Sequence, residues 1–463
     1  LIVILTLLFG IYLFKIPKTA RLGNQMAGLA MMMGVALTLW RNGLLYPGFL
    51  VGAIGIGGIC GWALAIRTNM IQIPAMIAFQ HGAGGLAACL VASVELAGYS
   101  ASIPFAAQSA GVAGLAIGAG TFSGSLVACG KLSGRLKQQP TILSHHNTVL
   151  ALISAAVIFM MVLGVVTGNP IGFFHLAVLS VLAAVLGVLF SIRIGGADMP
   201  VLISFLNATA GLAAALCGII LQNRLLIAFG ATVAASGSIL THVMCRAMNR
   251  GVAKVFTGSI SAKSHEGFAP FIETRPAVSA PSITRTEDLE RPNPLQEAIQ
   301  SLKEAASVII IPGYGMALAQ AQFLVARLSE KLQSMGKSVK FAIHPVAGRM
   351  PGHMHVLLAE AEIDYTNLFE MEAVNPDFAT TDLALVVGAC DVVNPAAIEV
   401  NDTPLSGMPI LLAKDARKIV VCNLDDKPGY SGVRNSLYQD PKTILVLGDA
   451  QNSISSIFEG LQL

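Results

Sequence analysis

The sequence predicts an α-helical polytopic membrane bundle of about nine transmembrane helices, followed by a C-terminal α/β domain with a doubly wound parallel sheet. Three observations support this fold class. The 463 residues are 54% hydrophobic and only 12% charged, against about 25% charged residues in an ordinary soluble domain. The apolar residues concentrate before residue 250, whereas 262–463 has the composition of a soluble protein. In that second half, short apolar segments alternate with helical ones, which indicates a parallel sheet.

A bilayer core about 30 Å thick needs about 20 apolar residues for each spanning helix. The first run opens the chain directly and is short as given, and no small-residue cleavage site follows it. We therefore expect a spanning helix with a clipped start rather than a signal peptide. The nine runs are approximately 1–14, 24–41, 44–66, 71–97, 104–129, 147–167, 171–192, 200–222 and 224–249.

Basic residues between these runs predict the orientation of the bundle, because cytoplasmic loops collect Lys and Arg. Alternate junctions hold eleven such residues and the opposite junctions hold two. The C-terminal half is therefore expected on the cytoplasmic side of an inner membrane, with the N-terminus on the opposite side. The eleven are Lys15, Lys18, Arg21, Arg67, Lys131, Arg135, Lys137, Arg193, Arg246, Arg250 and Lys254, and the two are Arg41 and Arg224.

Polar side chains inside the apolar runs are candidates for proton handling, because they are costly in a bilayer. His81 lies mid-run beside glycines, and a neutral imidazole can accept and release a proton near physiological pH. The alternative is a structural histidine bonded to a neighbouring helix. Asp198 precedes Pro200, which suits the first turn of a helix, so Asp198 is expected at the cytoplasmic mouth or simply as a cap. Asn207 follows about two turns deeper.

The composition divides the chain into three parts. Residues 1–250 form the predicted transmembrane domain, whose proton-translocating role is implied only by the resemblance described below. From 251 to 294 the apolar periodicity stops and Ser, Thr, Pro and charged residues take over, which is typical of a linker. Residues 295–463 form the predicted nucleotide-binding domain.

An apolar segment at 307–311 runs into a glycine turn, Pro312-Gly-Tyr-Gly-Met-Ala, which opens an amphipathic helix to about Met335. A strand, a glycine turn and a helix N-terminus together make a phosphate cradle, because the glycines allow close backbone approach and the helix N–H groups face the anion. The third glycine of the dinucleotide fingerprint is replaced by Leu318. The pattern still predicts a Rossmann-like domain.

The carboxyl ends of the strands are where a doubly wound sheet binds its ligand. Arg349, Asp391 and Asp449 follow three of the expected strands. Arg349 could clamp a phosphate bidentately, or it could be a solvated surface residue. Proline and glycines break any fixed ligand face around His344 and His353, so no metal site is expected. A helix is expected at 295–306, and further strands at 339–343, 383–387, 410–412, 419–422 and 444–447.

Four segments together resemble the beta subunit of proton-translocating NAD(P) transhydrogenases over nearly the whole chain. They are Gly195-Gly-Ala-Asp-Met-Pro200; the glycine turn with Gln320-Ala-Gln322; His344-Pro-Val-Ala-Gly-Arg-Met-Pro-Gly-His353; and Gly388-Ala-Cys-Asp391 with Asn394-Pro-Ala-Ala397. The resemblance implies that His81 and Asn207 take part in proton translocation, with Asp198 at the cytoplasmic end of the channel.

The resemblance also implies an NADP(H) site on this subunit, with the nucleotide in a flipped orientation and its pyrophosphate near the glycine turn. Hydride would pass directly from NADH, held by a partner alpha subunit, to NADP+ held here, in a dimer of alpha–beta units. The residues implied to hold NADP(H) are Gly313, Tyr314, Gly315, Met316, Ala317, Val346, Ala347, Gly348, Arg349, Met350, Pro351, Gly388, Ala389, Cys390, Asp391, Val392, Gly407, Met408, Asn423, Asp425, Lys427, Gly429, Tyr430, Asp449 and Ala450.

One segment departs from the family pattern. Where the family usually has Lys-Arg-Ser to grip the 2′-phosphate, this chain has Asn423-Leu-Asp425, followed by Asp426 and Lys427. Carboxylates beside a phosphate dianion repel it. NADP(H) binding then requires Lys427 or another cation to turn inward. We expect Lys427 to supply this charge, with both carboxylates directed to solvent.

Two functions from different classes fit the sequence. The first is an energy-coupling oxidoreductase subunit that is active only with its alpha subunit. The second is a membrane transporter or channel gated by a regulatory nucleotide-binding domain. No second nucleotide fold is expected in this chain, so the redox chemistry requires a partner. The net charge of +3 is small and scattered, which argues against nucleic acid.

Overall fold

The computed structural model describes residues 1–13, 17–42, 47–69, 72–98, 103–137, 140–167, 171–195, 198–248, 251–257, 293–350, 352–400, 403, 405–429 and 431–462. Most of the predicted linker lies outside these residues, as do Pro351 and Tyr430 of the predicted nucleotide site. The chain divides into two compact units, Leu1–Gly195 with Leu202–Thr241 and Gly196–Val201 with His242–Leu463. The domain boundaries expected from composition stay a prediction.

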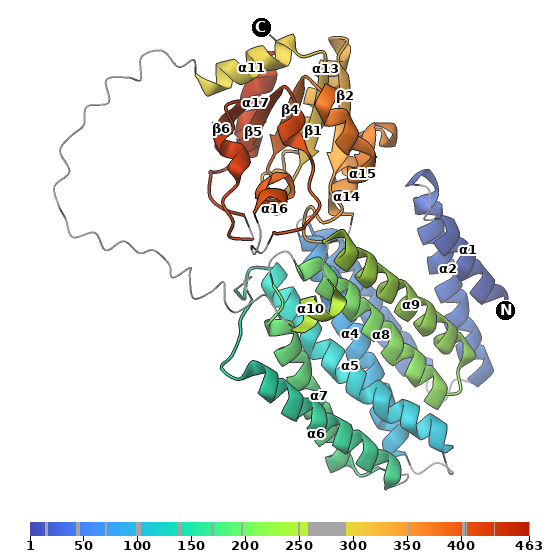
Figure 1. The fold of residues 1–463 in the computed structure, drawn as a ribbon. Helices are drawn as coiled ribbons and strands as arrows, with labels where there is room; N and C mark the ends of the chain where they lie inside the picture. Colours follow the sequence, from blue (N-terminus) through green and yellow to red (C-terminus); the bar gives the residue numbers. More distant parts are fainter. Residues whose placement is uncertain are drawn as a thin grey trace. The chain divides into compact units, whose positions relative to one another are not determined.

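Each of the nine predicted apolar runs is a helix in the described part of the chain (Figure 1). Eight are long and apolar enough to cross a membrane, whereas the first has 12 residues. The helices are α1 (Ile2–Leu13), α2 (Pro17–Asn42), α3 (Pro47–Arg67), α4 (Ile73–Ala97), α5 (Phe105–Leu132), α6 (His146–Val166), α7 (Phe173–Ile192), α8 (Met199–Ile220) and α9 (Arg224–Ala247).

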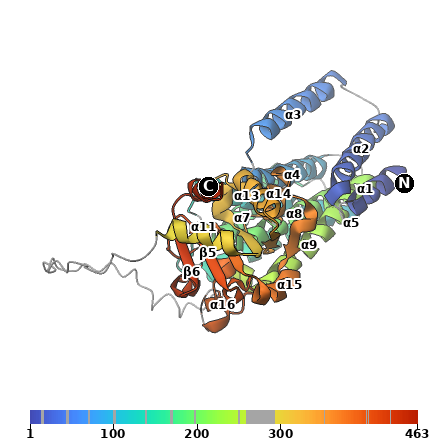
Figure 2. The ribbon, with the colours of Figure 1, turned by 90° about the horizontal axis from the view of Figure 1, so that it is seen from above.

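Helix α5 is the most buried of the eight spans, and it packs against α4, α6 and α7. Its sequence is rich in Gly, Ala and Ser, and such small residues let helix backbones approach closely in a bilayer. Helix α3 is the opposite case, since none of its residues with a described burial is buried (Figure 2). Small residues therefore allow the close packing of α5 but do not alone cause it, since α3 is also rich in glycine.

The second unit holds a six-stranded parallel sheet in the order β3-β2-β1-β4-β5-β6. This is the strand order of a dinucleotide-binding doubly wound sheet, with its switch point between β1 and β4. The register pairs Val308 with Val339 on one side and with Leu383 on the other. The strands are β1 (Ser307–Pro312), β2 (Ser338–Ile343), β3 (Leu368–Glu370), β4 (Leu383–Val387), β5 (Lys418–Asn423) and β6 (Thr443–Leu447).

Helices lie on both faces of this sheet (Figure 1). Helices α11, α13 and α17 pack together, and the Arg327 guanidinium lies 4.8 Å from the Phe458 ring centroid. The α-helices of this unit are α10 (Val252–Thr257), α11 (Pro294–Glu304), α12 (Tyr314–Leu318), α13 (Gln322–Ser334), α14 (His353–Glu360), α15 (Met371–Val374), α16 (Ala396–Glu399) and α17 (Ala450–Gly460).

The helix predicted after the glycine turn is interrupted. It ends at Leu318 and a second helix begins at Gln322, because Gln320 adopts a left-handed φ of 52°. The Ala321 N–H then donates to the Met316 carbonyl at 3.0 Å, the kind of bond that closes a helix C-terminus.

One predicted strand, at 410–412, is wrong, and β3 was not predicted. The side-chain amide of Asn375 donates to Ile410 O at 3.0 Å and accepts from Leu412 N at 3.1 Å. This amide therefore satisfies backbone groups that a neighbouring strand would otherwise bond. β3 has only three residues and pairs with the carboxyl half of β2, too short a run for periodicity to reveal.

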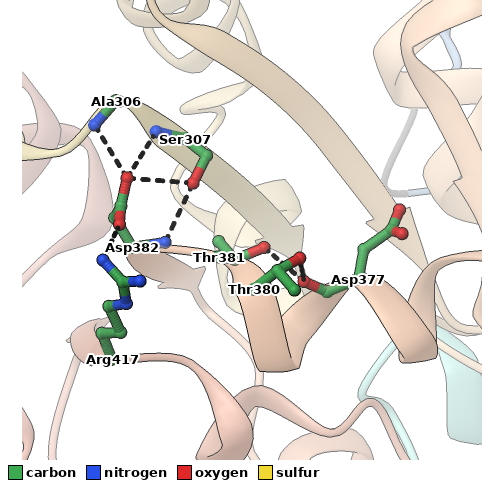
Figure 3. Close-up of polar contacts among 7 residues, drawn as sticks. All are labelled: Ala306, Ser307, Asp377, Thr380, Thr381, Asp382 and Arg417. Atoms are coloured by element: carbon green, nitrogen blue, oxygen red, sulfur yellow. Dashed lines mark hydrogen bonds and ion pairs between the residues drawn. The ribbon is translucent and has the colours of Figure 1, made fainter.

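The amino ends of β1 and β4 are joined through Asp382 (Figure 3). Its Oδ2 accepts hydrogen bonds from Ala306 N and Ser307 N, both at 3.0 Å, and from Ser307 Oγ at 3.1 Å. The Asp382 N–H donates to Ser307 Oγ at 2.9 Å, and Arg417 pairs with Oδ1 at 2.9 Å. Hydrogen bonds from the Ser307 backbone lower the pKa of this carboxyl. The carboxylate thus aligns the two strands whose opposite ends form the switch point.

Candidate functional site

Glycines bring the helix that carries His81 into backbone contact with α5. A Cβ added at Gly85 would lie 2.7 Å from Gly118 O, and one added at Gly82 would lie 3.0 Å from the Ser125 Cβ. Residue numbers thus rise on α4 as they fall on α5, so the two helices are antiparallel. His81 itself is half-buried, and its Nδ1 is buried with no hydrogen-bond partner among the described residues.

Asn207 lies on α8, which also contacts α5 in the antiparallel sense. Thr121 Oγ1 donates to Thr209 Oγ1 at 2.9 Å, and Gly114, farther back on α5, lies against Leu216 and Cys217. Projected onto α5, both His81 and Asn207 fall near residues 123–126. With a rise of about 1.5 Å per residue, the two side chains lie within about one helical turn of each other in depth.

Ser125 is a residue at this depth that the sequence reasoning missed. It is fully buried, and its Oγ has no hydrogen-bond partner in the described part of the bundle. Buried hydroxyls are normally bonded to protein or ordered water, so the unpartnered Oγ, on the residue that faces Gly82, leaves a hydrogen bond for water to complete. A serine within a Gly-Ser-rich helix gives no sequence signal for such a role. Asp198 directly precedes α8, and its place at the cytoplasmic mouth stays a prediction.

In the sheet domain, the glycine turn after β1 packs against the turn after β4. The Gly313 N–H donates to Val387 O and the Gly315 N–H to Gly388 O, both at 2.8 Å. A Cβ added at Gly315 would lie 2.7 Å from the Gly388 Cα, and Gly388 itself has a φ of 66°. These glycines join the two strand ends at the switch point, and their N–H groups are used there. The phosphate cradle predicted from the sequence therefore cannot use the N–H groups of Gly313 and Gly315 in this arrangement, and the cradle stays a prediction for the rest of the turn.

Arg349 stacks on an aromatic ring from the glycine turn. Its guanidinium carbon lies 4.2 Å from the Tyr314 ring centroid, which is cation–π geometry. The turn that carries Arg349 is held by His353, whose Nδ1 accepts from Arg349 N at 3.1 Å. Gly348, with a φ of 102°, leaves room for the His353 ring. The structure therefore brings Tyr314 and Arg349 together; that they hold an anion stays a prediction.

Two buried histidines brace this turn in the neutral form. Burial lowers the pKa of His344 and of His353 to about 4 in each case. His344 Nδ1 accepts from Val346 N at 3.2 Å, so its Nε2 carries the proton and donates to Pro409 O at 2.8 Å. This bond brings the segment that contains Gly407 and Met408 to the end of β2. His353 Nε2 is buried without a hydrogen-bond partner among the residues described.

Asp391 connects the end of β4 to the segment after β5. It accepts hydrogen bonds from Ser431 N at 3.0 Å and from Ser431 Oγ at 2.7 Å. A Cβ added at Gly429 would lie 2.8 Å from the Asp391 carboxylate, so only glycine fits there without a shift. Asp391 thus positions Gly429 and Ser431, the residues before and after Tyr430.

At the end of β5, Lys427 does not turn inward as expected. Its ammonium lies 3.1 Å from the Asp425 carboxylate and is 77% exposed, while Asp425 is 43% exposed. The ion pair with Asp425, in the same turn, keeps the Lys427 ammonium at the surface. Asn423 instead points into the protein, where its Nδ2 donates to Ala389 O at 2.8 Å and to the Tyr438 hydroxyl at 2.6 Å.

Asp449 has the role of a helix cap, since its Oδ1 accepts from Gln451 N and Asn452 N at the start of α17. It also lines a groove of about 450 Å³ beyond the end of β6, with Leu447, Gly448 and the first residues of α11. No group of three metal-ligating side chains occurs in the described ranges; His355 pairs with Glu370 at 3.1 Å instead.

Comparison with known proteins agrees with this architecture of membrane helices and a dinucleotide-type sheet. The family model described as NAD(P) transhydrogenase beta subunit matches residues 1–460. The NAD(P) transhydrogenase subunit beta of Rhodospirillum rubrum is 38% identical over 455 residues, which cover 96% of this chain and 94% of that protein. The chain therefore belongs to the NAD(P) transhydrogenase beta subunit family.

Proposed function

We propose that this chain is the membrane-embedded subunit of an enzyme that transfers hydride from NADH to NADP+ and couples the transfer to proton movement. NADH is held by a partner alpha subunit, and NADP(H) by the edge of the sheet in this chain. Family membership supports the reaction class. The observation that supports the coupling is the common depth of His81 and Asn207 beside Ser125, each contributed by a different helix.

The carboxyl ends of the strands, here called the sheet edge, carry groups that suit a dinucleotide. It offers a buried acceptor, Asn423 Oδ1, and a buried donor, His353 Nε2, neither of which has a partner in the described structure. Arg349 over Tyr314 supplies a positive charge beside the turn. Unsatisfied buried polar atoms are expensive unless a ligand or water completes them.

The roles of the side chains follow from this arrangement. The bound nicotinamide supplies the hydride chemistry, so no side chain needs to carry hydride. Arg349 binds the anionic part of the nucleotide, and neutral His344 and His353 hold its turn. In the membrane, His81 accepts and releases the proton, with Asn207 positioning it. NADP+ and NADPH bind with affinities that differ between the protonated and the deprotonated state of the proton site. This difference in binding free energy is the coupling free energy.

The proposal has the enzyme in the inner membrane, with the nucleotide domain in the cytoplasm and alpha–beta units paired as a dimer. It is tested with the purified chain and its alpha subunit in sealed vesicles that contain a pH-sensitive dye. Reduction of an NADP+ analogue by NADH should change the internal pH in step with hydride transfer. Proton flux that responds to nucleotide without any hydride transfer would instead identify a nucleotide-gated channel.

A further inference from the structure

One side chain, Thr121, contacts both of the helices that carry the proposed proton-handling residues. Thr121 lies on α5 and is only 3% exposed. A Cβ added at Gly85 of α4 would lie 3.0 Å from the Thr121 Cβ, and Gly85 follows His81 by about one helical turn. The Thr121 hydroxyl bonds Thr209 Oγ1 of α8 at 2.9 Å. Thr121 therefore joins α4 and α8 at the level of the proton site.

The hydrogen bond between Thr121 and Thr209 has a fixed direction. Thr209 Oγ1 donates to Leu206 O at 3.0 Å, and a carbonyl can only accept. A hydroxyl has a single proton, so Thr209 uses its proton on Leu206 and must accept from Thr121. The Leu206 carbonyl belongs to the peptide bond that joins Leu206 to Asn207. The two hydroxyls thus form a chain of hydrogen bonds from α5 to the peptide that precedes Asn207.

Small residues form the contact on the other side of α8. Gly211 follows Thr209 by two residues and so lies on the opposite side of the helix, where an added Cβ would lie 2.5 Å from Ala234 N of α9. Glycine and alanine let helices approach closely, but they have no long side chain that interlocks between two helices. A hydrogen bond, in contrast, weakens steeply as its angle closes. The bond between Thr121 and Thr209 therefore restrains both the rotation of α8 about its axis and its sliding along α5.

The position of α8 matters because Asn207 and His81 come from different helices. Asn207 is two residues before Thr209, so a movement of α8 on α5 at Thr209 also moves Asn207 relative to His81. A proton passes only between groups within hydrogen-bond reach, directly or through one water. A misplacement of about 1 Å can slow a reaction about 100-fold. A bond that restrains α8 beside Asn207 consequently restrains the geometry of the proton step.

We propose that Thr121 is a positioning residue for proton translocation, whose hydrogen bond to Thr209 holds Asn207 of α8 in place relative to His81 of α4. The hydroxyl proton stays on Thr121, and Thr121 exchanges no proton with the path. The inference rests on the proposed function, since it assigns Thr121 to the proton step of that reaction.

The first test compares Thr121→Val with Thr121→Ser in the chain assembled with its alpha subunit in sealed vesicles. Valine keeps the branched shape and loses the donor, whereas serine keeps the donor and loses a methyl group. Thr121→Val should lower kcat of proton-coupled hydride transfer roughly fivefold, within the factor of about 2–13 that one net hydrogen bond represents, and leave KM for both nucleotides unchanged. Thr121→Ser should keep more than half of the wild-type kcat. A larger loss with serine than with valine would show that Thr121 only packs, and would overturn the inference.

The second test is a double-mutant cycle. Thr209→Val removes the whole chain of hydrogen bonds, so adding Thr121→Val to it should cost no further activity. Thr241→Val is the matched control and should keep the wild-type kcat, because Thr241 is similarly buried, at 4% exposed, and its hydroxyl bonds the Gly237 carbonyl of its own helix at 2.8 Å. Losses that multiply in the double variant would overturn the inference and leave the proposed function intact. A wild-type complex that transfers hydride without moving protons would overturn both.

Discussion

Replacing Asp382 by Ala should destabilise the sheet domain by about 2–3 kcal/mol. The carboxylate accepts two backbone N–H bonds and one hydroxyl bond, and a buried bond to a charged group contributes about 1.5–3 kcal/mol net. Asp382 is 25% exposed, so water can partly satisfy the two amides in the variant. Arg417 is 73% exposed, and an exposed ion pair adds only about 0–1 kcal/mol.

The assay is urea unfolding of a fragment that begins at Asn293, followed by circular dichroism because both tryptophans lie in the membrane half. Asp377→Ala is the matched control. Among the described residues its side chain pairs with Lys340 at the surface, at 2.7 Å. Thr380 and Thr381 donate to its backbone carbonyl, which the variant keeps (Figure 3). The control should cost less than about 1 kcal/mol.

The effect of Asp382 should also depend on pH. The pKa of its carboxyl is lowered in the folded domain, so its contribution is fully present above the unfolded value of about 3.9. It is lost as the pH falls through the folded pKa. The difference between wild type and Asp382→Ala should therefore shrink below about pH 4. An equal loss in both variants at pH 7, or a difference that grows in acid, would refute the account of this carboxylate.

Two further predictions concern the membrane helices. His81→Ala should leave nucleotide binding unchanged and abolish proton-coupled turnover in vesicles; a variant that pumps at the wild-type rate would make His81 structural. Gly85→Val should separate α4 from α5, where a Cβ already meets the Gly118 carbonyl, and lower the thermal stability of the detergent-solubilised chain. Gly84→Val, where a Cβ meets nothing within 4 Å, is its control, and equal stability of the two would contradict the backbone contact.

Long apolar runs made the membrane half predictable. Each expected run became a helix with ends shifted by only a few residues, apart from α2, which begins at Pro17 rather than near residue 24. Its first turns hold Lys18 and Arg21. Hydropathy alone leaves charged turns out of a predicted span even when the backbone continues through them as a helix. The same reasoning located five of the six strands, because fully buried parallel strands are continuous apolar runs.

The errors arose where a side chain, rather than a run of residues, determines the backbone. Asn375 bonds both Ile410 and Leu412, so an apolar segment that looked like a strand needs no neighbour. Gln320 in a left-handed conformation ends a helix that the amphipathic pattern would continue. Neither contact has a local sequence signature, since each depends on residues that folding brings together.

The same limit applies to the functional site. The sequence identified His81 and Asn423 as candidate site residues. It could not show that His81 Nδ1, Ser125 Oγ and Asn423 Oδ1 are buried without hydrogen-bond partners among the described residues. At the sheet edge, Ala389 and Tyr438 occupy one half of the Asn423 amide and leave the other half open. A buried polar atom without a partner is costly. Such atoms can be found only from the neighbours that the fold supplies.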